Sequence, residues 1–204
     1  MHTNTDAHRF LRSRRSIRRF ADTPFEPEKI TRILETAVYA PSAHNSQPWR
    51  FAVLTSSNSK RELAEKMAEK FKFDLQKDQI PEEEIRSRLD RSKSRIINAP
   101  VIIILCLDGT ALDQYKDKRR QNAEIIMGVQ SVAMAGLQLL LAAHAEGLGG
   151  VWTCGPLFAP DVVQSTLSLS KSWKPQGMLL LGYPGEQPKV KELNKLEDTV
   201  AYID

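Results

Sequence analysis

The chain has 204 residues, 41% of them hydrophobic and 26% charged, which is ordinary for a soluble globular domain with or without a short extension. Its two cysteines, Cys106 and Cys154, exclude a disulfide framework and a CxxC metal site, and we predict no metal ligands. The formal net charge is +4, but residues 1–20 carry six arginines and one aspartate. The other 184 residues therefore sum to −1, so the positive excess is local and indicates a site for a particular anion.

The predicted elements alternate between helices and strands. A short helix precedes Arg14, and Pro27 suits the first position of a helix whose apolar residues recur at helical spacing as far as Val38. Further helices are expected at 60–73, 82–97, 119–146 and 160–169. Strands are expected at 49–55, 101–107, 151–153 and 177–183. This alternation favours a sheet between two helical layers, with parallel or antiparallel order left open.

Two of these segments carry further information. The β-branched run Val101–Leu107 suits a strand that is covered on both faces, and it is too short to span a bilayer. The helix at 119–146 is apolar around much of its circumference, which is typical of a core helix or a subunit interface, and Gly147 suits a left-handed cap at its end. The first residues lack the apolar segment of a secretory signal, so we predict a cytoplasmic protein without a membrane partner.

Three short segments carry the chemistry. The first, Arg14–Phe20 (RRSIRRF), sets four arginines around Ser16, and guanidinium groups match phosphate oxygens. Ile17 and Phe20 indicate that this run packs against a core, whereas a solvated or nucleic-acid-binding arm would lack them. The second, Ala40–Trp49 (APSAHNSQPW), is a proline-bounded loop whose side-chain amides suit the edge of a heterocycle, although polar loops are common. The third, Gly147–Gly155 (GLGGVWTCG), lets the backbone approach a flat ligand.

These three segments, in this order and spacing, resemble the nitroreductase family of flavin enzymes from about Phe10 to Tyr183. Within that family, the stretch from Ala99 to Tyr183 looks closest to the nitroreductase-like domain of deazaflavin-coenzyme glutamyl ligases. The resemblance implies an α+β fold, a three-layer α/β/α sandwich with a mixed, mostly antiparallel sheet. It also implies an FMN-binding homodimer, with residues 1–183 as the domain and 184–204 as an extension that packs on the dimer partner.

The resemblance also implies residue roles. Arg14 and Arg15 would hold the FMN phosphate, Ser16 would meet the phosphate or ribityl chain, and Arg18 would lie near the pyrimidine edge of the ring. The remaining expected contacts are Pro41, Ser42, Asn45 and Gln47 from the loop of the other subunit, Trp152, Thr153, Cys154 and Gly155 beside the ring, and Lys191 in the tail. Leu193 stands where relatives often have a second basic residue, which leaves Lys189 or Lys195 as substitutes.

The implied activity is that of an NAD(P)H-dependent flavin oxidoreductase with a ping-pong mechanism. The acceptor would be a nitroaromatic, a quinone or another conjugated compound, and the flavin carries the chemistry, so we expect no catalytic side chain. His44 is the only histidine expected near the site, in a structural role. Four alternatives stay open: action on a deazaflavin coenzyme or its precursor, oxygen-dependent fragmentation of the flavin, non-catalytic flavin binding, and a nucleic-acid arm at residues 1–20.

Overall fold

The computed structural model describes residues 5–24, 26–188 and 192–203. Its centre is a four-stranded sheet in the order β1-β2-β4-β3, formed by β1 (Trp49–Leu54), β2 (Val101–Asp108), β3 (Gly149–Thr153) and β4 (Trp173–Gly182). All three strand pairs are antiparallel. Parallel pairing enters at an isolated bridge between Ser16 and Gly150, beside the edge strand β3. The expected α+β sandwich is confirmed, with four strands that are all antiparallel and this bridge as the one parallel contact among the described residues.

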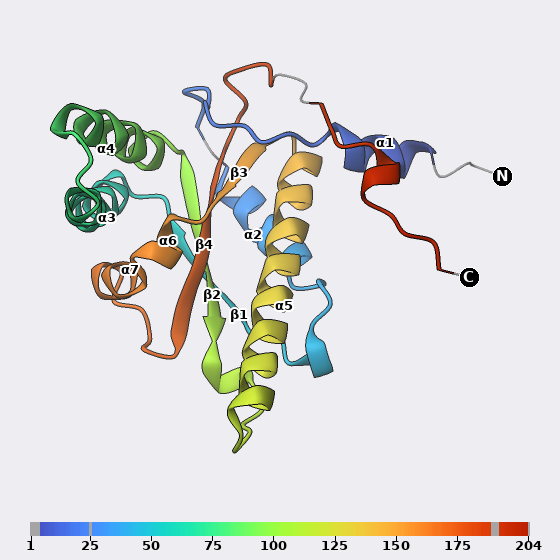
Figure 1. Cartoon of the computed structure of the whole chain (residues 1–204). Coiled ribbons are helices and arrows are strands. Elements are labelled where there is room, and N and C mark those ends of the chain that lie inside the picture. The colour runs from blue at the N-terminus through green and yellow to red at the C-terminus, as the bar shows by residue number, and fades with distance from the viewer. Residues whose placement is uncertain (1–4, 25, 189–191, 204) are drawn as a thin grey trace.

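Helices cover both faces of this sheet (Figure 1). One layer holds α2 (Pro27–Ala37) and α5 (Lys118–Ala145), and the other holds α3 (Ser57–Lys77), α4 (Glu82–Ile97) and α7 (Pro160–Thr166). The short α6 (Gly155–Phe158), which the sequence analysis missed, connects β3 to α7. The remaining short elements are α1 (Thr5–Ser13) and the 3-10 turns η1 (Ala43–Asn45), η2 (Gly109–Ala111) and η3 (Leu196–Asp198).

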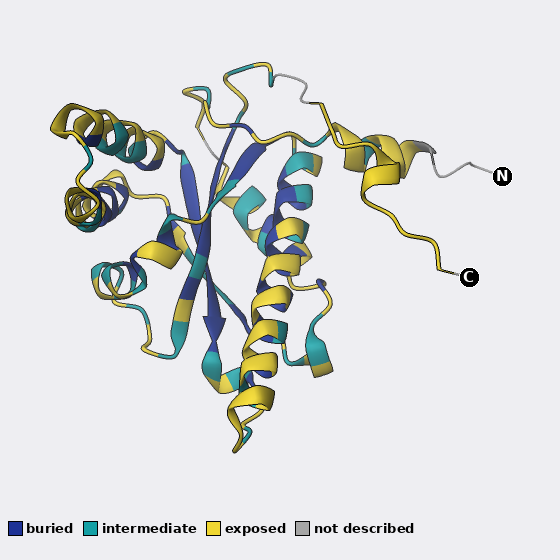
Figure 2. Cartoon of the chain, in the orientation of Figure 1, coloured by how far each residue is buried: buried dark blue, intermediate teal, exposed yellow. Residues whose placement is uncertain are grey.

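The central strand β2 divides the core in two. Because successive side chains of a strand point to opposite faces, Ile103 and Leu105 join the cluster under α2 and α5, while Ile102 and Ile104 join the cluster under α3 and α7. All eight residues of β2 are buried, which confirms that both faces are covered (Figure 2). Cys106 is fully buried, and burial raises the pKa of its thiol to about 12, so it acts as a hydrophobic core residue.

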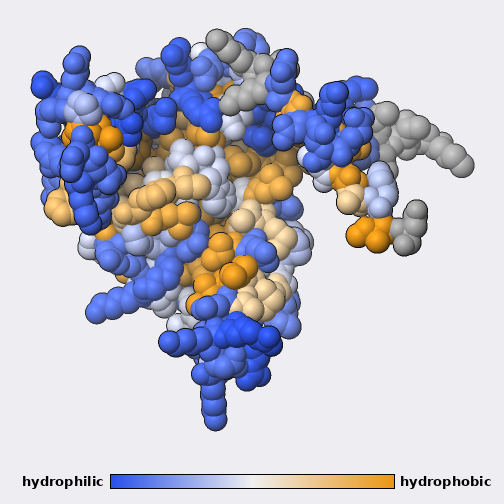
Figure 3. Space-filling view, in the orientation of Figure 1, coloured by the Kyte–Doolittle hydropathy of each residue, from blue (hydrophilic) through white to orange (hydrophobic). Residues whose placement is uncertain are grey.

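The long helix α5 is apolar on both its inner and its outer side. Its inner side packs on the sheet and on α2. Among the described residues it is the one helix long and apolar enough to cross a membrane by length and composition, and its place against the sheet accounts for that composition. Its outer side carries an exposed apolar stripe, Ile126, Val129, Ala133 and Leu137. Figure 3 shows apolar surface gathered along the middle of the face that carries α5.

Gly147 ends the turn after α5 in a left-handed conformation, with φ of 76°. A side chain is strained at this φ, which explains the glycine and confirms the expected cap. The turn leads directly into β3, so the end of α5 and the start of the edge strand lie together. This junction positions the site described next.

Candidate functional site

The arginine-rich segment after α1 is attached to the edge of the sheet. Ile17 N–H donates to the Gly150 carbonyl oxygen at 3.1 Å, and the Ile17 side chain is only 4% exposed. Further along, Ala21 N–H donates to Tyr183 O at 2.9 Å and Gly185 N–H donates to Arg19 O at 3.0 Å. The segment therefore runs in a fixed path along β3 and the end of β4, and residues 14–20 are not a free arm.

The arginines of this segment are accessible. Arg14 is half-buried, and Arg15 and Arg18 are exposed. Within the described part of the chain none of the three forms an ion pair, whereas Arg19 pairs with Glu186 at 3.8 Å. The Arg15 guanidinium donates to the Arg12 carbonyl, and to the Arg14 carbonyl at 2.9 Å, which holds it at the start of the segment. The site thus offers positive charge that the described fold does not neutralise.

A pocket of about 230 Å³ lies at this position. Arg14 and Arg15 line it together with the backbone of Gly149 and Gly150, and with Glu186 from the start of the tail. A cationic pocket with backbone at its wall is suited to a phosphate group. Ser16 and Arg18 do not line the pocket, although they belong to the same attached segment.

His144 also lines this pocket, which corrects the expectation that His44 would be the only histidine near the site. Its Nε2 lies 2.7 Å from Ser13 Oγ, and its ring stacks on Phe10 with centroids 5.0 Å apart. Burial, and to a lesser extent the charge of Arg14, lower the pKa of His144 below 6.5. The sequence signal was weak, since His144 reads as an ordinary residue of the last turn of a helix.

The proline-bounded loop is attached to the middle of α5. Ala43 N–H donates to Ser131 Oγ at 3.3 Å, and Ser131 is fully buried. Ser42 Oγ accepts from Gln47 N–H at 3.1 Å, and the Gln47 amide donates to Asn45 Oδ1 at 3.1 Å. The structure therefore brings three of the four expected loop residues into one local network, and Pro41 is exposed beside it.

The loop and the arginine pocket lie at separate places on one chain. The loop packs at Ser131 and the pocket at His144, which are roughly 20 Å apart along α5 at about 1.5 Å of rise per residue. One chain thus presents two half-sites at different points of the same helix. The exposed apolar stripe of α5, from Ile126 to Leu137, passes Ser131 and extends toward His144.

The third expected segment joins β3 to α6. The Trp152 indole is half-buried against Gly136 of α5 and Gly177 of β4, where added Cβ atoms would lie 2.1 and 2.8 Å from the ring. The Thr153 hydroxyl donates to Met178 O at 3.3 Å, and Cys154 is exposed with a free thiol. The side chains of Trp152 and Thr153 thus serve the fold, and Gly155 begins α6. Lys191, like Lys189, lies outside the described residues.

Comparison with known proteins identifies the family of this chain. The model of the nitroreductase family matches residues 11–183. A Methanothermobacter thermautotrophicus protein that carries the name NADH dehydrogenase/NAD(P)H nitroreductase is 31% identical over 188 residues, which cover 90% of this chain and 80% of that protein. The 5,6-dimethylbenzimidazole synthase of Rhodospirillum rubrum is 26% identical over 186 residues, which cover 90% of this chain and 84% of the synthase.

A solved structure agrees as well. The crystal structure of a nitroreductase from Desulfovibrio desulfuricans in complex with FMN matches with a TM-score of 0.73 at 25% sequence identity, and the match covers 99% of each chain. The family model spans the arginine segment, the loop, the β3–α6 junction and the whole sheet. The chain therefore belongs to the nitroreductase family.

Proposed function

We propose that this protein is an FMN-dependent oxidoreductase that takes electrons from NAD(P)H and passes them to a small conjugated acceptor such as a nitroaromatic or a quinone. The observation that carries the proposal is the pocket at Arg14 and Arg15, because the fold holds these guanidinium groups at the sheet edge without an ion-pair partner among the described residues. Family membership and the FMN complex of the Desulfovibrio desulfuricans structure support the same cofactor.

The residues present fit FMN. Arg14 and Arg15 would hold its phosphate, and the nearby Ser16 hydroxyl would bind the phosphate or the ribityl chain. Arg18, exposed further along the same segment, would stabilise negative charge at the pyrimidine edge of the ring. The junction from Trp152 to Gly155 would border the ring with its backbone, since the Trp152 and Thr153 side chains are already used in packing.

When bound, FMN supplies the redox chemistry, accepting electrons from NAD(P)H and giving them to the acceptor in a ping-pong cycle. The protein's own task is to bind and orient the two reactants, so we assign no catalytic acid or base. Among the described residues the Cys154 thiol has one hydrogen bond, from Trp152 Nε1 at 3.1 Å, and an indole N–H is not a base, so a nucleophilic role is not proposed.

The complete site requires a second copy of the chain. The two half-sites at Ser131 and His144 are too far apart on one helix to meet the same cofactor. A two-fold dimer formed through the exposed stripe of α5 would bring the loop of one subunit, with Ser42, Asn45 and Gln47, to the arginine pocket of the other. Such a dimer would also bury apolar surface that is otherwise solvent-exposed.

The tail supports the same assembly. The tail side chains of Leu193, Tyr202 and Ile203 are 89%, 87% and 93% exposed. Apolar groups at this exposure in the last residues suit an extension that packs on the partner subunit, with residues 1–183 as the domain. Lys195, or Lys189 and Lys191 outside the described residues, would then complete the phosphate site. A cytoplasmic location stays a prediction.

An absorption spectrum of the purified protein tests the proposal. We expect a flavin spectrum that is bleached under nitrogen by NADH or NADPH and restored by an acceptor. Arg15→Ala should lower FMN occupancy, whereas Arg9→Ala, which removes the same charge from exposed helix α1, should not. Unchanged occupancy in Arg15→Ala together with lost nucleic-acid binding would overturn the assignment, and flavin that neither nicotinamide bleaches would indicate a storage protein or a deazaflavin-linked enzyme.

A second candidate function rests on the similarity to the Rhodospirillum rubrum 5,6-dimethylbenzimidazole synthase. The isoalloxazine ring contains a dimethylated benzene ring with two nitrogen substituents, which is the skeleton of that product except for the one carbon that joins the two nitrogens. Oxygen-dependent fragmentation of the reduced flavin is therefore the alternative. Product analysis of the reduced protein in air separates the two functions, because intact FMN after many turnovers favours the oxidoreductase.

A further inference from the structure

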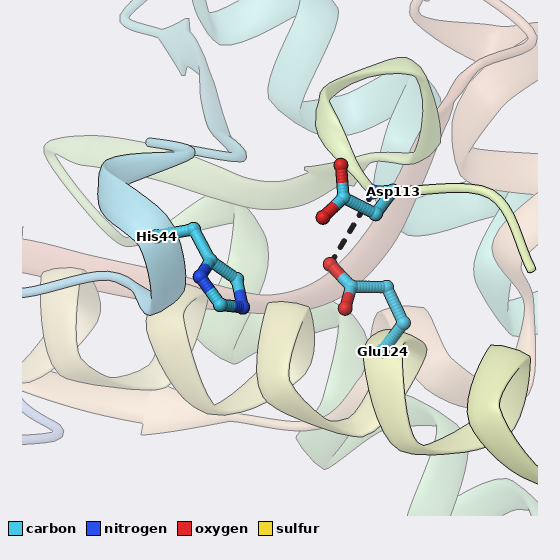
Figure 4. Close-up of side chains that lie close together, drawn as sticks. All are labelled: His44, Asp113 and Glu124. Carbon is cyan, nitrogen blue, oxygen red and sulfur yellow. Dashed lines mark hydrogen bonds between the residues drawn. The ribbon is translucent and has the colours of Figure 1, made fainter.

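Three side chains that could bind a metal converge beside the loop. His44 comes from η1, Asp113 from the turn before α5, and Glu124 from the second turn of α5 (Figure 4). One ligand atom of each, an imidazole nitrogen and two carboxylate oxygens, can be chosen so that all lie within 4.8 Å of one another. Two ligands bound at about 2.1 Å to one ion are separated by roughly 3 to 4 Å, so a small side-chain adjustment brings this set into coordination range.

Glu124 is the unusual member of the cluster. Glu124 is only 2% exposed, and its Oε1 accepts a hydrogen bond from Asp113 N–H at 3.3 Å. Its Oε2 has no hydrogen-bond partner. Within residues 5–24, 26–188 and 192–203 it is the one buried side-chain oxygen or nitrogen atom that lacks such a partner. A buried, unpaired carboxylate oxygen is costly, so its retention needs a compensating group.

Residues of the described chain do not supply that compensation. Neither Asp113 nor Glu124 takes part in an ion pair within the ranges that the structure covers, and the neighbouring Arg120 is used by Asp117, the N-cap of α5. The two carboxylates of the cluster therefore have no positively charged partner among the described residues. One divalent metal ion would balance their two negative charges.

The donor set indicates which metals fit. One imidazole and two carboxylates suit Zn²⁺ or Mn²⁺, and the presence of a histidine disfavours Mg²⁺ and Ca²⁺, which prefer oxygen ligands. Three protein ligands leave coordination positions for water. Because His44 and Asp113 are exposed, solvent reaches the cluster from one side while Glu124 closes it from the other.

The backbone of His44 gives the site a structural consequence. His44 has a φ of 54°, as does Asn45, and this left-handed conformation is uncommon for residues other than glycine. A metal bond to His44 would stabilise this conformation and hold the loop against α5. We infer that His44, Asp113 and Glu124 form a binding site for a divalent transition-metal ion that fixes the loop between Pro41 and Gln47.

Metal titration of the tag-free protein tests the inference. The purified protein is treated with a chelator and titrated with Zn²⁺, Mn²⁺ and, for comparison, Mg²⁺, while bound metal and the thermal midpoint are measured. We expect one Zn²⁺ or Mn²⁺ per chain and a rise of the midpoint, with Mg²⁺ much weaker. His44→Ala, Asp113→Asn and Glu124→Gln should each weaken binding by about tenfold or more and abolish the thermal shift.

Matched variants distinguish this site from adventitious binding. His8→Ala removes an exposed histidine on α1, and Asp117→Asn removes the carboxylate at the N-cap of α5, four residues after Asp113. Both variants should bind metal like the wild type. Metal-free Glu124→Gln should be at least as stable as the metal-free wild type, because it removes an uncompensated buried charge. That result also shows that the variant folds, so lost binding cannot come from unfolding.

Two outcomes would overturn the inference. Absence of Zn²⁺ and Mn²⁺ binding at millimolar concentration would show that a metal ion is not the group that compensates Glu124. Equal binding by the wild type and the three cluster variants would place the metal elsewhere. The two readouts are the metal content and the thermal stability of the purified protein, so they do not depend on the proposed redox function.

Discussion

The side chain of Ile17 occupies the space in which a side chain at position 149 would begin. A Cβ atom added to Gly149 would lie 2.6 Å from Ile17 Cγ1, closer than such atoms approach. The glycine therefore serves the close packing of the arginine segment on β3, a different purpose from the approach of a flat ligand that the glycine-rich run suggests. The proposed binding of FMN at Arg14 and Arg15 would thus depend on a contact between two apolar residues.

Ile17→Ala should weaken FMN binding by tenfold or more. Removal of a buried isoleucine side chain costs about 2–5 kcal/mol, and here the loss acts on the attachment of residues 14–20 to the sheet. Fluorescence titration of the apoprotein with FMN measures the effect, with Leu11→Ala on exposed α1 as the control. An unchanged dissociation constant would show that the segment stays in place without this contact.

Gly149→Ala should have a similar effect, because the added methyl group displaces Ile17. The double variant Ile17→Ala/Gly149→Ala should bind FMN no more weakly than the worse single variant, since alanine at position 17 leaves room for the new methyl group. Additive losses in this double-mutant cycle would mean that the two residues act on the cofactor independently.

His144 provides a spectroscopic reporter of phosphate binding. Burial and then the charge of Arg14 lower its pKa, so Arg14→Ala should raise the pKa, and a bound phosphate should raise it further in the wild type by offsetting the Arg14 charge. NMR titration of the histidine ring protons measures both shifts. His8, exposed on α1, is the internal control. A pKa of His144 that is unchanged both by Arg14→Ala and by FMN would contradict the assignment of the pocket.

The outer stripe of α5 should determine the oligomeric state. Leu137 is 53% exposed, and Leu137→Glu places a charge in the proposed interface, so it should shift the dimer toward monomer and lower FMN occupancy together. Light scattering and the flavin absorbance measure the two effects. Phe73→Glu, which adds the same charge at an exposed aromatic residue of α3 on the opposite face of the sheet, should change neither. A dimeric Leu137→Glu would place the interface elsewhere.

Acid should destabilise the fold partly through Asp108. Burial by itself raises the pKa of this carboxyl, but hydrogen bonds from Thr110 and the Arg50 guanidinium, with Nη2 3.0 Å from Oδ2, bring it below 3.8. The stabilisation is fully present above the unfolded-state pKa near 3.8 and is lost as the pH falls from there through the lower folded-state value. Urea unfolding at pH 7, 4 and 3 measures this loss.

In the same experiment Asp108→Asn should be less stable than the wild type at pH 7, and the difference should shrink toward pH 3. Asp22→Asn, at an exposed loop position, serves as the control and should follow the wild type. A difference between Asp108→Asn and the wild type that stays constant over this pH range would show that the charge of Asp108 contributes nothing to the acid dependence.

Local patterns in the amino-acid sequence were enough to predict most helices and strands and the layering of helices on a sheet. The buried run at 101–107, the helix that begins at Pro27 and the cap at Gly147 were all predicted correctly, because periodicity, proline and left-handed glycine are local properties of the chain. The spatial arrangement of the arginine segment, the proline-bounded loop and the glycine-rich run could not be predicted on that basis. Their family resemblance, confirmed by the family model, supplied the fold.

The side chains that meet in space could be identified from the folded structure alone. His144 lines the arginine pocket, and Trp152 packs between Gly136 and Gly177. Glu124 lies beside His44 and Asp113. These partners lie on different elements, and their contacts depend on how helices and strands pack, which no local pattern encodes. The charge and shape of a site arise from such long-range packing, whereas secondary structure follows from neighbours along the chain.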